Sequence, residues 1–359
     1  MPASAPPGGA STAGRPTAAG DDLAERALGG DRRSLARLLT EIENRTAAGE
    51  AGLRRLYPLA GRAHLVGVTG APGAGKSTLV AALIGLARRT GRAVAVIAID
   101  PSSPITGGAL LGDRVRMQEH AGDRDVFIRS MASRGHAGGL APATVGAAAV
   151  LDAVGFPLVF IETVGTGQSE VEVAAIADTT LVVQSPEMGD EVQAIKAGLL
   201  EVADLVVVNK GDRPGAQRAA AQLRAMLTVG RGQDRAAEAA GRPRPKRPEV
   251  LLVTASDGGG VAELLAALDR RAGDAEERHD PFDGARRSRA RAQLLGILAE
   301  RVAGRLQAAD LQPQAEALVV AVAAHEADPY TAADAMLDLL GPPGNSPRGA
   351  GGRNVRAVP

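Results

Sequence analysis

The most informative segment of the chain reads Gly70-Ala71-Pro72-Gly73-Ala74-Gly75-Lys76-Ser77-Thr78. It contains a complete match to the pattern G-x-x-x-x-G-K-[ST]. An apolar run over residues 64–69 precedes the match, and a helical pattern begins near Lys76. Glycines let backbone N–H groups converge on phosphate oxygens, and the N-terminus of a following helix adds a favourable dipole. The segment therefore predicts a strand, a phosphate-binding loop over residues 70–78 and a helix.

Two side chains of this loop carry its expected chemistry. Lys76 is expected to place a compact positive charge on the β- and γ-phosphates, and Ser77 to offer its hydroxyl to Mg²⁺. The alternative is a glycine-rich turn without a ligand, which would need neither the strand before it nor the helix after it. We therefore expect a nucleotide and Mg²⁺ as the bound species.

Short apolar runs alternate with helical segments over much of the chain. These runs cover residues 64–69, 93–99, 126–130, 157–162, 180–184, 205–209 and 250–254. Near-continuous apolar strands separated by helices indicate a parallel sheet with both faces covered. We therefore predict an α/β fold of the P-loop NTPase class, with a mostly parallel central sheet flanked by helices and with helical extensions at both ends.

The sequence divides into five parts. We predict a disordered tail at 1–20, an N-terminal extension of two helices at 21–60, the nucleotide-binding domain at 61–284 with a surface insertion at 230–248, a C-terminal helical region at 285–340 and a second disordered tail at 341–359. In the C-terminal region, Leu294, Leu295, Leu298 and Val302 fall on one helical face. These C-terminal helices either cap the sheet or form a dimerisation arm.

The composition excludes several classes of protein. The 359 residues include 41 basic and 41 acidic side chains, so the formal net charge is zero. A neutral chain lacks the overall positive charge that nucleic acids and acidic membranes attract, so we expect neither as a partner. There is no Cys, which excludes disulfides, thiolate metal sites and a thiol nucleophile. No apolar run reaches transmembrane length and no signal-peptide pattern follows the start, so we expect a cytoplasmic protein.

Three carboxylates complete the expected metal site. Asp100 and Glu162 stand at the ends of apolar runs, and Asp113 follows a glycine-rich segment. Mg²⁺ prefers oxygen ligands, and an acid at the end of the strand beside the phosphate loop is a Walker-B position. We expect Ser77, Asp100, Asp113 and Glu162 as ligands, although Asp113 suits a helix N-cap equally well and Glu162 could face solvent. Gly165 would let its N–H approach a γ-phosphate.

A second motif indicates which base is bound. Asn209-Lys210-Gly211-Asp212 follows an apolar run and matches N-K-x-D. Asp212 can accept hydrogen bonds from N1–H and the exocyclic amine of guanine, whereas adenine would leave the buried carboxylate unpaired. The stem of Lys210 can cover the base, and Thr254-Ala255-Ser256 fits a loop whose backbone N–H meets guanine O6. The sequence therefore predicts GTP and GDP as the nucleotides.

Taken together, these motifs resemble the MeaB/ArgK family of P-loop GTPases, relatives of the human methylmalonic aciduria type A protein. The resemblance covers about residues 21–340. It rests, beyond the nucleotide motifs, on Ala98-Ile99-Asp100-Pro101-Ser102-Ser103-Pro104, on Leu111-Gly112-Asp113-Arg114-Val115-Arg116-Met117, on Phe127-Ile128-Arg129-Ser130-Met131-Ala132-Ser133-Arg134-Gly135-His136, on Glu162-Thr163-Val164-Gly165-Thr166-Gly167-Gln168-Ser169-Glu170 and on Gly189-Asp190-Glu191-Val192-Gln193-Ala194-Ile195-Lys196.

The resemblance implies a function in cofactor handling. Members of the family are chaperones of adenosylcobalamin-dependent acyl-CoA mutases, chiefly methylmalonyl-CoA mutase. It implies GTP-gated loading of the cofactor, protection or reactivation of the mutase, and a homodimer built through the C-terminal helices. Residues 185–196 would form a switch that reports the nucleotide state, and Lys196 would act with Lys76 and Glu162 in the active site. The sequence Ser185-Pro186-Glu187-Met188 departs from the small residues usual there.

Other readings of the sequence remain. A metallochaperone GTPase shares a similar domain but usually carries Cys or His clusters, whereas this chain has no Cys and five scattered His. A kinase or ATPase linked to basic amino-acid transport would need an acceptor site, and no residues indicate one. A nucleotide-gated scaffold would bind GTP with incidental hydrolysis. No Gln follows Gly165 directly, so the residue that positions the attacking water is not evident, and Gln168 is one candidate.

Overall fold

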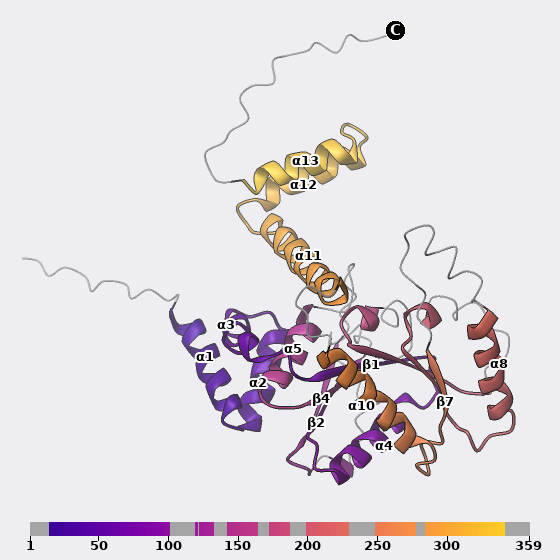
Figure 1. Ribbon diagram of the computed structural model, residues 1–359. Helices are drawn as coiled ribbons and strands as arrows, with labels where there is room; N and C mark the ends of the chain where they lie inside the picture. Colours follow the sequence, from indigo (N-terminus) through magenta and orange to yellow (C-terminus); the bar gives the residue numbers. More distant parts are fainter. Residues whose placement is uncertain are drawn as a thin grey trace, which may run out of the picture. The chain divides into compact units, whose positions relative to one another are not determined.

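The computed structural model describes most of the chain as helices and strands (Figure 1). The described residues are 14–100, 119–120, 122–132, 142–163, 172–186, 199–229, 248–277 and 284–341. The chain forms two compact units, residues 1–290 and residues 291–359, and we describe each by itself. Most of the expected insertion at 230–248 lies outside the described residues.

The first unit is built on one seven-stranded sheet in which every pairing is parallel. The strands are β1 (His64–Thr69), β2 (Val94–Asp100), β3 (Val126–Ala132), β4 (Leu158–Thr163), β5 (Thr179–Gln184), β6 (Leu205–Val208) and β7 (Glu249–Leu252), in the order β3-β2-β4-β1-β5-β6-β7. Each lies on one of the seven apolar runs, so the predicted α/β fold with a parallel sheet is confirmed. Strands buried on both faces need apolar residues at nearly every position, which is why the runs are continuous.

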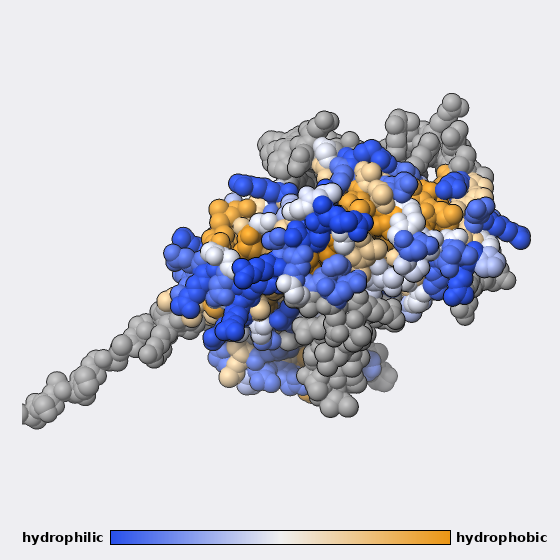
Figure 2. All heavy atoms as spheres, turned by 90° about the horizontal axis from the view of Figure 1, so that it is seen from below, coloured by the Kyte–Doolittle hydropathy of each residue, from blue (hydrophilic) through white to orange (hydrophobic). Residues whose placement is uncertain are grey.

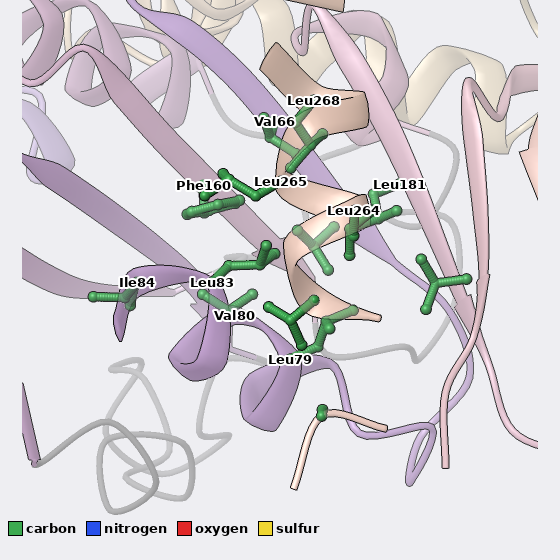
Figure 3. Close-up of a cluster of buried hydrophobic side chains, with 14 of the residues drawn as sticks. Val66, Leu79, Val80, Leu83, Ile84, Phe160, Leu181, Leu264, Leu265 and Leu268 are labelled. Carbon is green, nitrogen blue, oxygen red and sulfur yellow. The ribbon is translucent and has the colours of Figure 1, made fainter. Parts of the chain in front are cut away.

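Helices bury both faces of this sheet. On one face, α4 (Lys76–Arg89) and α10 (Val261–Glu277) pack together, and Figure 3 shows Leu79 and Leu83 of α4 beside Leu264 of α10, over Phe160 of the sheet. The other face is covered by α5 (Pro142–Ala153) towards β3, and by α8 (Ala216–Val229) towards β7. Both layers hold the carboxyl ends of the strands in fixed register, and the expected nucleotide motifs lie at those ends.

Three helices precede the sheet, where the sequence predicted two. They are α1 (Gly14–Leu28), α2 (Arg32–Glu43) and α3 (Ala47–Leu56), followed by the short η1 (Tyr57–Leu59). The prediction of a disordered tail is wrong for residues 14–20, because α1 already begins at Gly14. A Cβ at Gly20 would lie only 2.1 Å from the carbonyl oxygen of Ala48, so α1 and α3 are in direct backbone contact at that residue.

The second unit contains only helices among its described residues. Helix α11 (Gly284–Leu306) crosses the boundary between the units, and α12 (Gln312–Ala323) and α13 (Pro329–Leu339) form an adjacent pair. Asp328 caps α13 by accepting hydrogen bonds from the N–H groups of Tyr330 and Thr331. Within the described residues, no helix combines the length and apolar character that a membrane span requires.

The space-filling view in Figure 2 shows how polar and apolar side chains share one face of the molecule. Among the coloured residues, hydrophobic areas are interrupted by hydrophilic ones, and none of them extends over the whole face. Scattered apolar side chains of this kind are usual on protein surfaces.

Candidate functional site

The phosphate loop lies between the end of β1 and the first turn of α4. Gly70, Gly73 and Gly75 have φ angles of 135°, 76° and 89°, which side-chain-bearing residues rarely adopt. A Cβ at Gly70 would lie 2.1 Å from the carbonyl oxygen of Val183 in β5, so the loop starts in contact with the neighbouring strand. Glycine is thus required both by backbone conformation and by the close approach of β5.

The Lys76 side chain lies within its own loop. Its Nζ donates hydrogen bonds to the carbonyl oxygens of Gly70 at 2.7 Å and Ala71 at 3.1 Å. Lys76 is only 6% exposed, and it stands at the first position of α4. The loop thus places a buried positive charge beside its own backbone at a helix N-terminus, which is an arrangement that attracts anions.

Ser77 and Glu162 meet at the carboxyl edge of the sheet. The Ser77 hydroxyl donates to Oε1 of Glu162 at 2.7 Å, and both residues are buried. Glu162 reaches this position because β4 pairs directly with β1, in a register that sets Glu162 opposite Val68. The predicted Walker-B carboxylate therefore lies against the phosphate loop and does not face solvent.

This pair supplies the type of donor that Mg²⁺ prefers, since a hydroxyl and a carboxylate are both oxygen ligands. The sequence also proposed Asp100 and Asp113 as ligands. The backbone of Asp100 ends β2, but its side chain, and all of Asp113, lie outside the described parts of the structure. Among the described residues no group of three or more His, Cys, Asp or Glu side chains is gathered as a metal site. The residues present fit a magnesium ion that takes its remaining ligands from elsewhere.

The N-K-x-D motif follows β6 and adjoins the loop after β7. The N–H of Gly211 donates to the carbonyl oxygen of Val253 at 2.9 Å, which brings the two loops together. Lys210 has a φ of 57°, a left-handed conformation that is uncommon for a residue other than glycine. Strained backbone of this kind concentrates at ligand sites, where surrounding contacts hold it in place. Asp212 lies two residues beyond, in a turn between β6 and α8.

Asn209 connects these loops to the phosphate loop. Its Nδ2 donates to the carbonyl oxygen of Ala74 at 2.9 Å, and its Oδ1 accepts from the N–H of Ala255 at 3.1 Å. The side chain is only 2% exposed. The sequence predicts Asn209 at the nucleotide but does not indicate this bridge, because the bridge depends on three loops that are far apart in the chain. The P-loop, the N-K-x-D motif and residues 254–256 thus form one site.

A cavity of about 800 Å³ opens beside this site. The part of the cavity nearest to the loops is lined by Thr78, Ala255, Ser256 and Asp257. Further residues of α4 also line it. The expected binding residues from Gly70 to Thr78, with 209–212 and 254–256, therefore cluster at one edge of the sheet. Gly165, Gln168 and Lys196 lie outside the described residues.

Comparison with known proteins identifies the family. A family described as "Methylmalonyl Co-A mutase-associated GTPase MeaB" matches residues 35–311. A relative from Pyrococcus abyssi is 45% identical over 322 residues, covering 89% of this chain and 97% of the relative. The mitochondrial methylmalonic aciduria type A homolog of Caenorhabditis elegans is 35% identical over 258 residues, covering 67% of this chain and 63% of that protein.

The fold agrees with a solved structure. The crystal structure of an LAO/AO transport system kinase superimposes with a TM-score of 0.63 and 28% sequence identity, covering 90% of this chain and 98% of the other. The family match extends over more than half of the chain, and the family is described as one of GTPases. The chain therefore belongs to the MeaB family and is a P-loop GTPase.

Proposed function

We propose that this GTPase uses a Mg²⁺-dependent GTP cycle to gate the loading of adenosylcobalamin into an acyl-CoA mutase, and to protect or reactivate that enzyme. Methylmalonyl-CoA mutase is the proposed partner. One observation carries the nucleotide part: the buried Asn209 side chain bridges the phosphate loop and the loop at Ala255. The family description and the name of the Caenorhabditis elegans relative support the mutase part.

The residues of the site have distinct proposed roles. The proposed nucleotide contacts are Gly70, Ala71, Pro72, Gly73, Ala74, Gly75, Lys76, Ser77, Thr78, Gly165, Asn209, Lys210, Asp212, Thr254, Ala255 and Ser256. Magnesium would be held by Ser77 and Glu162 with Asp100 and Asp113, and its positive charge would offset charge on the phosphates. Lys196 is proposed to reach the active site from the switch at residues 185–196.

Hydrolysis in such a site depends on positioning and on charge neutralisation. Lys76 lies at the N-terminus of α4 with its ammonium beside Gly70 and Ala71, which supports the proposal that it neutralises the oxygens of a phosphate bound on the loop. The Ser77–Glu162 hydrogen bond fixes the serine hydroxyl in one orientation. Since no glutamine follows Gly165 directly, we propose slow intrinsic turnover that rises when a partner orders the switch segments.

The proposed base specificity is tested at Asp212. Asp212→Asn exchanges a double acceptor for a group that can also donate, which suits the carbonyl that xanthine carries in place of the guanine amine. GTP affinity should therefore fall more than affinity for xanthosine triphosphate, and the two can be compared by calorimetry with Mg²⁺. An unchanged preference would count against Asp212 as the residue that recognises the base. Lys76→Ala, which removes the phosphate contact, should lose binding of both nucleotides.

The chaperone role is tested with a purified mutase. GTP hydrolysis is measured alone and with methylmalonyl-CoA mutase, and adenosylcobalamin transfer is followed by absorbance with GTP, GDP or a non-hydrolysable analogue. Stimulated hydrolysis with nucleotide-dependent transfer supports the proposal. Hydrolysis that ignores the mutase contradicts it, and phosphate transfer to an amino acid or protein would instead favour the transport-kinase reading that the LAO/AO kinase structure represents. A pull-down with a GTP analogue then identifies which mutase binds.

A further inference from the structure

Strand β4 ends in two consecutive polar residues, Glu162 and Thr163, and both are buried. Side chains of successive strand residues point to opposite faces of a sheet. Phe160, two residues before Glu162, belongs to the core under α4 and α10, whereas Ile161 belongs to the core on the other face. Glu162 therefore lies on the phosphate-loop face, and Thr163 lies on the opposite face.

Thr163 contacts the strand that leads into the phosphate loop. Its hydroxyl lies 3.2 Å from the Thr69 hydroxyl and 3.4 Å from the carbonyl oxygen of Val68. Thr163 and Thr69 are both 0% exposed. Glu162 is opposite Val68 in the parallel register, so Thr163 comes opposite Thr69 one step further along. Two buried hydroxyls thus face each other directly before Gly70.

The end of β4 is consequently held on both faces of the sheet. On one face Glu162 accepts a hydrogen bond from Ser77 at 2.7 Å, and on the other Thr163 is bonded to Thr69 at 3.2 Å. Both partners, Thr69 and Ser77, flank the same loop in the sequence. A shift or twist of this strand end would therefore move Glu162 relative to Ser77.

We propose that Thr163, with Thr69 as its partner, is a positioning residue that holds Glu162 opposite Ser77 for the magnesium-dependent step. The inference rests on the proposed role of Glu162 at the metal. A valine would fill the same volume as Thr163 without the hydroxyl, so packing alone does not account for a hydroxyl at this fully buried position. The Thr163 hydroxyl adds a hydrogen bond, and a hydrogen bond has a preferred distance and angle, whereas a methyl contact has none. The bond therefore fixes the ends of β4 and β1 relative to each other.

The test uses Thr163→Val, which removes the bond at nearly constant volume, and Thr163→Ser, which keeps the hydroxyl. Thr69→Val removes the same bond from the other side, and Glu162→Gln reports the role of the carboxylate itself. Release of a fluorescent GDP analogue is followed while Mg²⁺ is titrated, alongside kcat and KM for GTP and the thermal midpoint. Thr163→Val is expected to raise the Mg²⁺ concentration needed to retain GDP by about three- to tenfold, the effect of one neutral hydrogen bond.

The expected pattern is specific to positioning. Thr163→Ser should restore the Mg²⁺ response. Thr69→Val with Thr163→Val should be no worse than Thr163→Val alone, because Thr163→Val already removes the bond to Thr69 together with the 3.4 Å contact to Val68. KM for GTP should change less than kcat. A Thr163→Val protein with an unaltered Mg²⁺ response, or a serine variant as impaired as the valine variant, overturns the inference. The inference is also overturned if Thr163→Val changes the Mg²⁺ response while Glu162→Gln does not. That result would in addition contradict the metal role proposed for Glu162.

Discussion

Gly75 shows how one missing side chain sets the geometry of the site. A Cβ there would lie 2.4 Å from Nδ2 of Asn209, the atom that donates to Ala74, whereas a Cβ at Gly73 would meet nothing within 4 Å. Both glycines have positive φ, at 89° and 76°. Replacement by alanine therefore costs backbone strain at both positions, but only at Gly75 does it also displace a buried side chain.

Gly75→Ala should accordingly lower the free energy of unfolding by about 2–3 kcal/mol, since it adds the loss of buried hydrogen bonds to the strain. Gly73→Ala, the matched control, should cost only about 1 kcal/mol. Urea denaturation without nucleotide measures both, because a bound ligand would stabilise the two variants unequally. Equal losses would mean that Asn209 moves aside freely.

His64 gives the stability of the sheet a dependence on pH. Its Nε2 lies 2.8 Å from the Thr179 hydroxyl, and burial lowers the pKa of His64 below its usual value, although Asp178 and Asp269 oppose this shift. The native state therefore keeps His64 neutral while the unfolded chain takes up a proton below about pH 6.5. The contribution of neutral His64 to the free energy of unfolding is complete above that pH. It is lost as the pH falls from there towards the lowered pKa of the native state.

Acidification from pH 7.5 to 5.5 should thus reduce the free energy of unfolding more in the natural chain than in a His64→Gln variant. The glutamine keeps a polar group beside Thr179 but does not titrate. Denaturant curves at several pH values give the difference between the two proteins, which removes the contribution of other titrating groups. Parallel pH profiles would contradict a neutral buried His64.

At the scale of elements, one ion pair joins the N-terminal helices to the sheet. Glu43, the last residue of α2, bonds Nη2 of Arg129 in β3 at 2.6 Å and accepts from the N–H of Ala132 at 3.1 Å. The Glu43 and Arg129 side chains are 13% and 17% exposed. A charge left without its partner at such a depth is costly.

Glu43→Ala should therefore cost about 2–4 kcal/mol of unfolding free energy, with the exposure of the pair reducing the value expected for a fully buried one. Asp22→Ala is the control, because the Asp22–Arg26 pair is more than half exposed on both sides and should contribute less than about 0.5 kcal/mol. Urea unfolding of both variants measures the contrast. A similar small effect for both would show that α2 is attached mainly by its apolar face.

The sequence predicts elements better than the bonds between them. Every strand was found because burial on both faces demands a continuous apolar run, and the phosphate loop was found because its glycines have no substitute. The third N-terminal helix, α3, was missed because it packs on α2 through Gly49 and Gly52, and no local pattern records that close approach. The bridges from Asn209 and Thr163 depend on strand register, so they could not be predicted from residue spacing.

At the scale of the whole molecule, the second unit exposes apolar side chains that a solitary chain would leave in water. Leu294, Leu295 and Leu298 of α11 are 68%, 58% and 56% exposed, and Val319 and Val320 of α12 are 49% and 58% exposed. Large apolar side chains clustered on helices favour association, because burial contributes about 25 cal/mol for each Å² removed from water. This pattern is in line with the homodimer that the resemblance to the MeaB/ArgK family implies.

Leu294→Glu with Leu298→Glu should weaken that association at least about tenfold, because it would bury two charges in an apolar contact. Ala303→Glu adds a charge at an exposed position that is not three or four residues from any of these leucines, so it should leave the assembly intact. Sedimentation equilibrium over a range of concentrations gives the association constant, and GTP hydrolysis checks that the first unit still folds. If the natural chain sediments as a monomer at all concentrations, the dimer is contradicted. If, in that monomer, the α11 leucines are also protected from chemical labelling by solvent-borne reagents, the result favours the alternative that these helices cap the sheet.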